Sequence, residues 1–200
     1  MKPNVGMLYP VASAVNTYTP YSSITYGTGF VVSEARGADV QWETENGEFY
    51  GDDILLDAAK GIVGYTIAFE AAGLADTVRA KLLGEVKNNS TSEYTINGAD
   101  APDVGFGYIR RMRDNSGSSV VETFEAWWFY KVKFAQPNET ARTKERTLEW
   151  RAPTLNGTGM GVYLTAAAEK PDFAAHQTFA TLALAKSYLN TKAGISSGTT

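Results

Sequence analysis

Residues 38–84 decide the fold and read ADVQWETENGEFYGDDILLDAAKGIVGYTIAFEAAGLADTVRAKLLG. Apolar and polar or small residues alternate over residues 40–43 and again over residues 63–69, which is the period of a half-buried β-strand. Residues 74–83 instead carry leucine or valine at every fourth position, one stripe of a short amphipathic helix. The stretch therefore predicts two strands followed by a helix.

The segment that joins the two strands is acidic. Before Lys60 no Lys or Arg interrupts it, and residues 44–60 form a long protruding loop or hairpin. Such a loop fits three interpretations, which are a catalytic site, a metal site or a surface that contacts a partner. The carboxylates of the segment are Glu43, Glu45, Glu48, Asp52, Asp53 and Asp57.

Composition limits the function classes. The 200 residues suit one domain with arms, and the formal net charge of −4 argues against tight nucleic-acid binding, which needs many basic residues to displace counterions. The chain has no cysteine, so disulfide frameworks and thiolate chemistry are excluded. No apolar run approaches the ~20 residues that span a bilayer. The N-terminus is a poor secretory signal, so we expect no membrane partner and a product of the cytoplasm.

Residues 1–25 contain Pro3, Pro10 and Pro20 among polar residues and tyrosines. Proline at this density blocks a helix and disfavours a central strand. We expect an extended N-terminal arm. It is either a flexible terminus or a segment that lies on a neighbouring subunit.

The longest predicted strand is VVETFEAWWFYKVKFA, residues 120–135. At ~3.3 Å per residue it would exceed the usual strand length, so we expect a bend or bulge within it. Trp127 and Phe129 fall on its otherwise polar face, which suggests a second packing layer or a subunit interface. It follows a strand at residues 104–112.

Residues 139–151 are predicted to return as a strand and form the most basic segment, with Arg142, Lys144, Arg146 and Arg151. This segment is either a solvated face or a surface complementary to the acidic loop of another copy. Asn156 and the glycines that follow it predict a turn at residues 156–159. Val162, Tyr163 and Leu164 then predict a last short strand at residues 162–164.

A second, alanine-rich helix is expected to open at Pro171–Asp172 and to end near Asn190, followed by a frayed tail. The predicted organisation is an arm at 1–25, a β domain at 26–165 and a C-terminal helix and tail at 166–200. The fold class is mainly β with two helices (α+β), a β-sandwich or partial barrel with one helix packed on the sheet.

Enzymatic chemistry finds little support. The one histidine, His176, falls within the expected C-terminal helix, away from any nucleophile motif, and zinc is improbable without cysteine. Asp52, Asp53 and Asp57 lack the spacing of a calcium loop, and the glycines of residues 157–162 match no phosphate-binding motif. A glycosidase-type carboxylate pair stays possible but unspecific. Aromatic residues interleaved with basic ones at 127–133 favour base stacking only weakly. We therefore expect no enzyme and no cofactor.

The chain resembles the major tail proteins (tail tube proteins) of long non-contractile-tailed bacteriophages, in particular the phi13-type family. Seven segments match in order and together cover roughly residues 5 to 165. They are residues 5–9, 40–53, 69–70, 74–84, 104–108, 128–131 and 152–158. The C-terminal part of the chain has no match in this resemblance.

The resemblance implies a structural virion protein that assembles into stacked hexameric rings and forms the tube through which DNA is ejected. Its expected location is the phage tail, with the host cytoplasm before assembly. Expected partners are further copies of itself and the tape-measure, tail-tip and tail-terminator proteins, with genomic DNA only in transit. The resemblance also implies a ring core closed by sheets from all subunits.

Residue roles follow from this resemblance as hypotheses. We expect a ring-stacking loop with Phe49, Tyr50, Asp52, Asp53, Ile54, Leu55 and Leu56. We expect Gln41, Glu43 and Thr66 to face the lumen. The alternative function is a monomeric β-sandwich binding or decoration module of a phage particle. A hydrolase with an acidic site is a third interpretation and requires two close carboxylates in a cleft.

Overall fold

The structure, a computed structural model, describes residues 3–51, 54–98, 100–115, 120–137 and 153–196, without the side chains of residues 46–60. Within these ranges the chain forms a nine-stranded antiparallel sheet, a small two-stranded sheet and two α-helices. The prediction of a mainly β protein with two helices is confirmed. The predicted strand at 139–151 and its basic residues lie outside the described residues.

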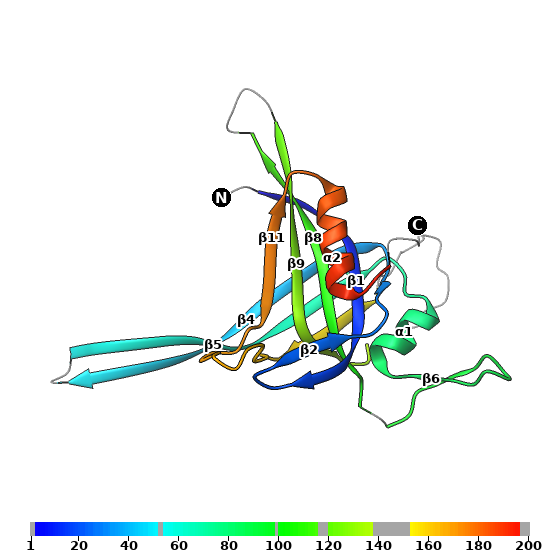
Figure 1. The fold of residues 1–200 in the computed structure, drawn as a ribbon, viewed down its shortest axis with the longest axis horizontal. Coiled ribbons are helices and arrows are strands. Elements are labelled where there is room, and N and C mark those ends of the chain that lie inside the picture. The colour runs from blue at the N-terminus through cyan, green and yellow to red at the C-terminus, as the bar shows by residue number, and fades with distance from the viewer. Residues whose placement is uncertain (1–2, 52–53, 99, 116–119, 138–152, 197–200) are drawn as a thin grey trace, which may run out of the picture.

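The large sheet curls so that β4 at one end contacts β1 near the other (Figure 1). Its order is β2 (Ser23–Tyr26), β1 (Asn4–Thr19), β8 (Asp103–Asp114), β9 (Val121–Phe134), β10 (Thr154–Gly159), β5 (Ile54–Ala71) and β4 (Ala35–Gly51). Two strands lie off this path, β3 (Phe30–Val31) beside β1 and β11 (Ala174–Phe179) beside β9. The small sheet pairs β6 (Val86–Lys87) with β7 (Tyr94–Thr95), and the helices are α1 (Asp76–Leu83) and α2 (Leu182–Ala193).

The expected N-terminal arm is in fact strand β1, which lies between β2 and β8. Pro10 is tolerated because the pairing with β8 shifts register between Leu8 and Val11, and Tyr9 has a φ of 51° at this bulge. A bulge is one of the few places in a sheet that accept proline. The Pro10 carbonyl accepts a hydrogen bond from the Val32 amide, and Val11 beyond it is fully buried.

The bulge expected in the strand at residues 120–135 is confirmed, but this strand is not the longest, because β9 has 14 residues whereas β1, β4 and β5 have 16, 17 and 18. Val104 pairs with Val132, whereas Phe106 pairs with Phe129, so β9 contains one more residue than β8 across this interval. A single extra residue reverses which face later side chains occupy. Strand β9 therefore contributes Trp128 to one hydrophobic cluster and both Phe129 and Phe134 to the other.

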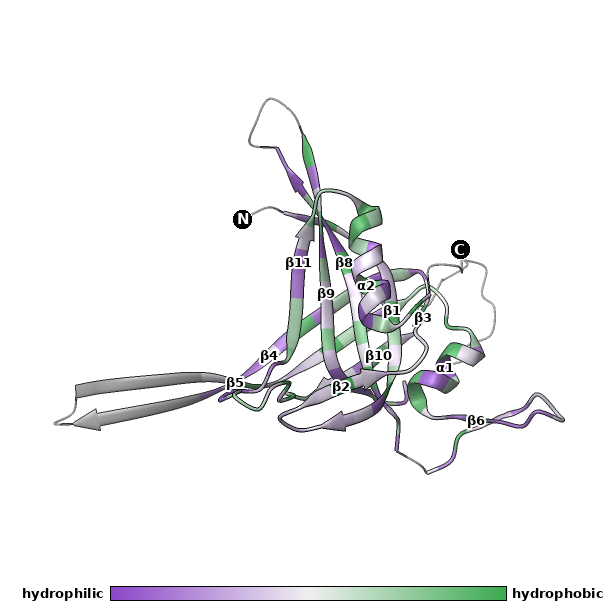
Figure 2. Ribbon diagram, viewed as in Figure 1, coloured by the Kyte–Doolittle hydropathy of each residue, from purple (hydrophilic) through white to green (hydrophobic). Residues whose placement is uncertain are grey.

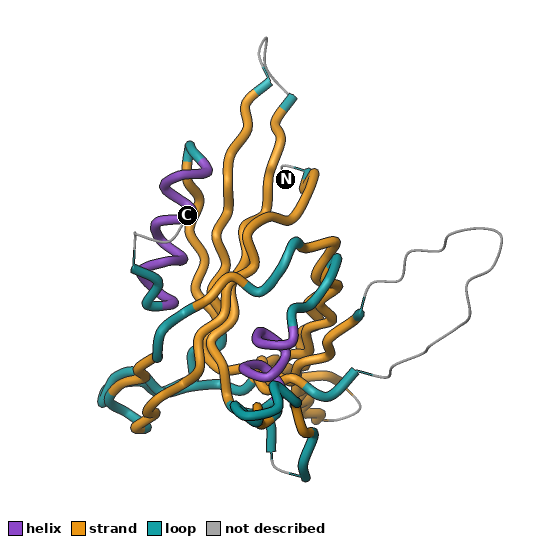
Figure 3. The backbone as a smooth tube through the Cα atoms, turned by 90° about the vertical axis from the view of Figure 1, so that its right-hand side faces the viewer, coloured by secondary structure: helices purple, strands orange, loops and turns teal. Residues whose placement is uncertain are grey.

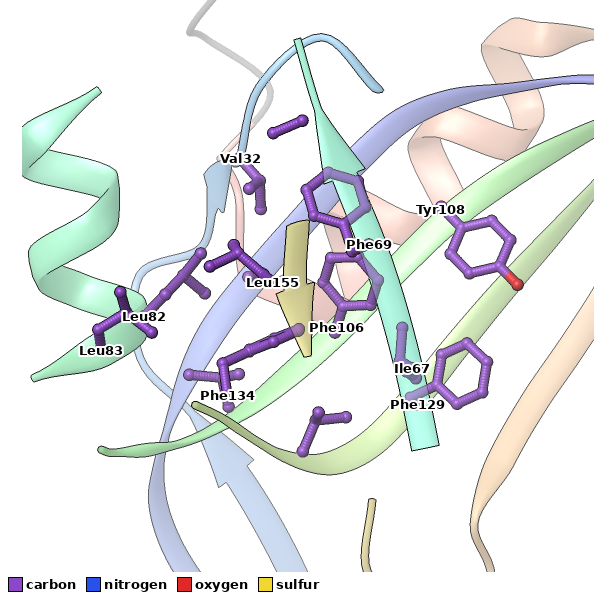
Figure 4. Close-up of a cluster of buried hydrophobic side chains, with 14 of the residues drawn as sticks. Val32, Ile67, Phe69, Leu82, Leu83, Phe106, Tyr108, Phe129, Phe134 and Leu155 are labelled. Carbon is purple, nitrogen blue, oxygen red and sulfur yellow. The ribbon is translucent and has the colours of Figure 1, made fainter. Parts of the chain in front are cut away.

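Two hydrophobic clusters lie on opposite faces of the shared strands. The larger cluster is rich in aromatic side chains and includes Phe69, Phe106, Phe134 and Leu155 (Figure 4). The smaller cluster forms where α2 packs across β1, β8 and β9 (Figure 3). The second packing layer that Trp127 and Phe129 suggested is therefore present within the chain, since Phe129 is fully buried.

Helix α1 forms as predicted and begins two residues later than expected. Leu82 and Leu83 are buried in the larger cluster, with Val78 packed against it. Gly84 ends the helix with a φ of 77°, a left-handed conformation that glycine adopts without a Cβ clash.

The predicted turn at residues 156–159 is wrong, because these residues form the body of β10 between β5 and β9. A Cβ on Gly159 would lie 1.9 Å from Tyr65 Cζ, and a Cβ on Gly157 would lie 2.7 Å from Val132. The glycines are thus required by close packing rather than by a turn. The strand expected at 162–164 is limited to a bridge between Val162 and Asp172.

The C-terminal helix expected from Asp172 is wrong in its first half. Residues 174–179 form β11, which pairs with β9 at six consecutive positions, and α2 begins at Leu182. The Thr181 side chain caps α2 by accepting a hydrogen bond from the Leu184 amide at 3.4 Å. Pairing with β9 outweighs the modest helix preference of this alanine-containing segment. Because β11 belongs to the large sheet, the boundary expected at 165 does not separate a structural unit.

Candidate assembly surfaces

The β4–β5 hairpin is the most prominent feature of the surface. It leaves the curled sheet and projects well beyond it along the longest axis of the molecule (Figure 1). Its backbone is paired from Ala35 opposite Ala71 as far as Gly51 opposite Ile54, with register shifts at three places. The protruding hairpin predicted at 44–60 is therefore present.

The predicted ring-stacking residues are distributed over both strands of this hairpin. Tyr50 pairs with Leu55, so these two proposed anchors are cross-strand neighbours in the backbone, whereas Phe49 pairs with Asp57. Ile54 and Leu56 belong to β5. Asp52 and Asp53 lie outside the described residues.

The base of the hairpin leaves three large apolar side chains exposed, which the sequence did not indicate. Trp42 is 39% exposed, Ile62 46% and Val63 54%. Trp42 also contacts Tyr65, with ring centroids 5.2 Å apart, so one side of the indole is supported by the core. The alternation of residues 40–43 predicted an inward Trp42, which is correct, but gave no sign that the sheet leaves part of it uncovered.

The predicted lumen-facing residues are brought together on one outward face. Gln41 lies directly opposite Thr66, and Glu43 lies opposite Gly64. Gln41 and Glu43 are exposed, and Thr66 is half-buried. Their inward neighbours on the same strands, such as Tyr65 and Ile67, are buried in the larger cluster. The assignment to a lumen stays a prediction.

This outward face contains a shallow groove of about 350 Å³ that continues onto β10. Asp39 is the one charged residue among the described residues that line it, and Gln41 donates a hydrogen bond to Asp39 at 3.5 Å. The other lining residues are Thr66, Ile67, Ala68, Ala135, Asn156, Gly157 and Thr158. Among the described residues the groove therefore presents a carboxylate and no cation, which gives it no attraction for phosphate, although Lys133 pairs with Thr158 at its margin on β9.

The one histidine lies in strand β11 rather than in a helix. Its ring stacks on Trp127 with centroids 4.5 Å apart, and its Nδ1 lies 3.4 Å from a Glu125 oxygen. Arg110 lies over the same indole at 5.3 Å and 3.8 Å from Glu125. These contacts join β8, β9 and β11, and no nucleophile is part of them.

Within the described ranges, no three His, Asp or Glu side chains are grouped to hold a metal ion. Over the same part of the chain, neither helix is long and apolar enough to cross a membrane. Burial raises the pKa of Tyr26, Tyr65 and Tyr108, so these phenols stay neutral well above their ordinary range. They act as packing and hydrogen-bonding groups.

The four basic residues proposed for contact with a neighbour, Arg142, Lys144, Arg146 and Arg151, lie outside the described residues.

No protein-family model matches this chain, and no curated protein matches it.

Proposed function

We propose that this chain is a tail tube protein of a long non-contractile-tailed bacteriophage, assembling into stacked hexameric rings that form a conduit for DNA. The observation that carries the proposal is the projecting β4–β5 hairpin, which occupies the chain position where the resemblance expects a ring-stacking loop. The curled sheet with a helix on it fits the sandwich or partial barrel of that protein type.

The hairpin gives a physical reason for assembly. An isolated two-stranded hairpin is marginally stable in water, because it has no hydrophobic face to bury. Here the tip carries Phe49, Tyr50 and Leu55 in its sequence, and the base leaves Trp42 and Val63 exposed. Contact with another copy would bury apolar surface at both ends of the hairpin, worth roughly 25 cal/mol per Å².

The outward face of β4, β5 and β10 suits the wall of a DNA conduit. Gln41, Glu43 and Thr66 lie on this face, and Asp39 adds a further carboxylate within its groove. Negative and neutral polar groups repel or ignore phosphate, so DNA would pass without being held. This arrangement supports the lumen-facing role that we propose for these residues.

The test replaces both members of one cross-strand pair at the hairpin tip. A Tyr50→Ala, Leu55→Ala variant should stay folded and soluble but form no tubes in negative-stain electron microscopy at high concentration, whereas the parent chain forms them. The matched control is Val86→Ala with Ile96→Ala, which removes two side chains that are 54% and 58% exposed elsewhere. This control should form tubes.

Normal tubes from the hairpin variant would refute its stacking role. If the parent chain elutes as a small species in size-exclusion chromatography and shows no tubes, the alternative gains support. That alternative is a monomeric β-sandwich module that binds or decorates a phage particle.

A further inference from the structure

The free edges of the large sheet differ in how they are protected against pairing with another chain. Edge strand β2 is four residues long and faces a register shift between Val15 and Thr17 of β1. Edge strand β4 has three register shifts and carries charged residues such as Arg36, Asp39 and Glu45. Short length, bulges and charges are the devices by which proteins prevent edge-to-edge association.

Strand β11, although only six residues long, has neither the bulges nor the charges. Its six residues, AAHQTF, pair with β9 without a register shift and include no Lys, Arg, Asp, Glu or Pro. Among the described strands it pairs with β9 alone, and residues 176–178 are exposed. Figure 2 shows its hydrophilic centre at the outer margin of the sheet. Its free backbone edge is therefore a template for another strand.

Strands β1, β8, β9 and β11 lie side by side in this order. β11 is the free edge at one end of this set, and the first residues of β1 form a second free edge at the other end. Residues 4–8 of β1 pair with β8 on one side, whereas β2 pairs with residues 15–19 and β3 with residues 11–12 of β1. The row Leu8, Ile109, Ala126 and Gln177 runs across β1, β8, β9 and β11 at one level. No described strand lies beyond either end of this row.

Strand direction selects the partner. Each neighbouring pair in the row is antiparallel, so β1 runs opposite to β11, whereas β2, β3 and β4 all run in the direction of β11. A second copy placed beside the first in the same orientation can therefore continue the antiparallel pattern only by placing its β1 next to β11. Antiparallel pairing is the more stable kind.

We infer that β11 of one copy pairs with residues 4–8 of β1 of a second copy, joining their sheets. Neither segment, NVGML nor AAHQTF, contains an ionised carboxylate, lysine or arginine that would repel its partner. Val5 is the extra residue of a bulge in the β1–β8 pairing and is 50% exposed. After it, Gly6, Met7 and Leu8 pair with β8 at consecutive positions without a further shift. This join rests on the self-assembly proposed above and gives the C-terminal segment a part in it.

The absence of native cysteine makes the join testable by thiol crosslinking. Gly6 and Gln177 lie on the same face of the four strands, and a Cβ on Gly6 meets no atom within 4 Å. A Gly6→Cys, Gln177→Cys double variant, treated with a short bifunctional thiol reagent under assembly conditions, should give a ladder of crosslinked multimers. Each single variant should give none.

The matched control is Gly98→Cys with Gln177→Cys, because a Cβ on Gly98 also meets open space, away from this edge. Equal crosslinking in this control would overturn the inference. Crosslinked dimers from Gln177→Cys alone would also overturn it, because they would show β11 paired with β11 of a second copy.

Electron microscopy of the same samples separates this inference from the proposed function. Tubes without crosslinks in the double variant would reject the join and leave the tail tube proposal intact. A crosslinked ladder without tubes would support the join and count against the tube.

Discussion

Strands β10 and β11 have the same length and pair with the same side of β9, one near each end, yet they differ in almost everything else. β10 is flanked on both sides, by β9 and β5, and two of its residues are glycines against which large side chains pack. β11 is flanked on one side, carries a polar centre and leads into α2. One strand is part of the core, and the other is an edge that stays available.

The difference shows where this fold tolerates change. At β10 the ring of Tyr65 occupies the volume that any side chain on Gly159 would need. At β11, residues 176–178 are exposed, and no described strand pairs with the side of β11 that faces away from β9. Substitutions in β10 should therefore affect the whole fold, and those in the β11–α2 segment should act locally.

The largest expected effect is at Gly159. A Gly159→Val variant should lose at least ~4 kcal/mol of unfolding free energy, above the usual overpacking cost, because the new Cβ would lie within the Tyr65 ring. Urea denaturation measures this loss. The control Gly98→Val, at a site with open space, should change stability by less than about 1 kcal/mol. Equal stability of the two variants would refute the role assigned to β10.

A smaller and more local effect is expected in the β11–α2 segment. Leu189 of α2 is fully buried against β1, β8 and β9, and Leu189→Ala should cost about 3 kcal/mol. Amide hydrogen exchange should show β11 and α2 losing protection while β10 and β5 retain it. The comparison variant Leu155→Ala, in β10, should instead reduce protection throughout the large sheet. Identical exchange patterns would contradict the distinction between the strands.

The smallest effect is the response to alkaline pH. Burial raises the pKa of Tyr65, which packs on β10, and of Tyr26, which donates to the Tyr130 carbonyl at 2.8 Å. The pKa of each phenol in the folded chain lies above its value of ~10 in the unfolded chain. The contribution of each phenol to the unfolding free energy is therefore complete below pH 10 and is lost as pH rises beyond it.

Each of these two phenols should therefore lower the unfolding free energy by about 1.4 kcal/mol per pH unit above pH 10. A Tyr65→Phe variant should lose its share of this slope, as measured by denaturation at a series of pH values. An unchanged slope would indicate that Tyr65 ionises as freely in the folded chain as in the unfolded one.

Sequence patterns correctly predicted the strands and the helix whose formation depends on residues close together in the chain. The alternation around Trp42 and Tyr65, the leucine stripe of α1 and the Gly84 cap each depend on residues close in the chain. The bulge in β9 was also predictable, since the expected strand exceeds the usual strand length. The protruding hairpin followed from two such strands joined by a long acidic segment, residues 44–60.

The errors arose where a distant neighbour decides the structure. Glycines at 157 and 159 look like turn residues until Tyr65 and Val132 are seen to occupy the space above them. The segment 174–179 looks helical until the edge of β9 offers it a partner. The prolines of the first 25 residues suggested an arm, because the bulge that accommodates Pro10 is formed with β8, far away in sequence.

The candidate surfaces divide in the same way. The outward face of Gln41, Glu43 and Thr66 was predictable from alternation alone. The exposure of Val63 and the free edge of β11 were not, because both depend on where the sheet stops. Residues 174–181 carry no Lys, Arg, Asp or Glu and lead into a helix cap, and this is a local signal that could have indicated β11.

The attachment of the β4–β5 hairpin also has a mechanical consequence. β5 continues from the hairpin into the sheet and is bonded to β10 over six consecutive residue pairs. Antiparallel hydrogen bonds lie perpendicular to the strands, so a pull along the hairpin loads these bonds together in shear instead of breaking them one after another. The projecting element is therefore anchored to bear tension along its own axis, and it would yield far more readily to a force that peels β4 sideways.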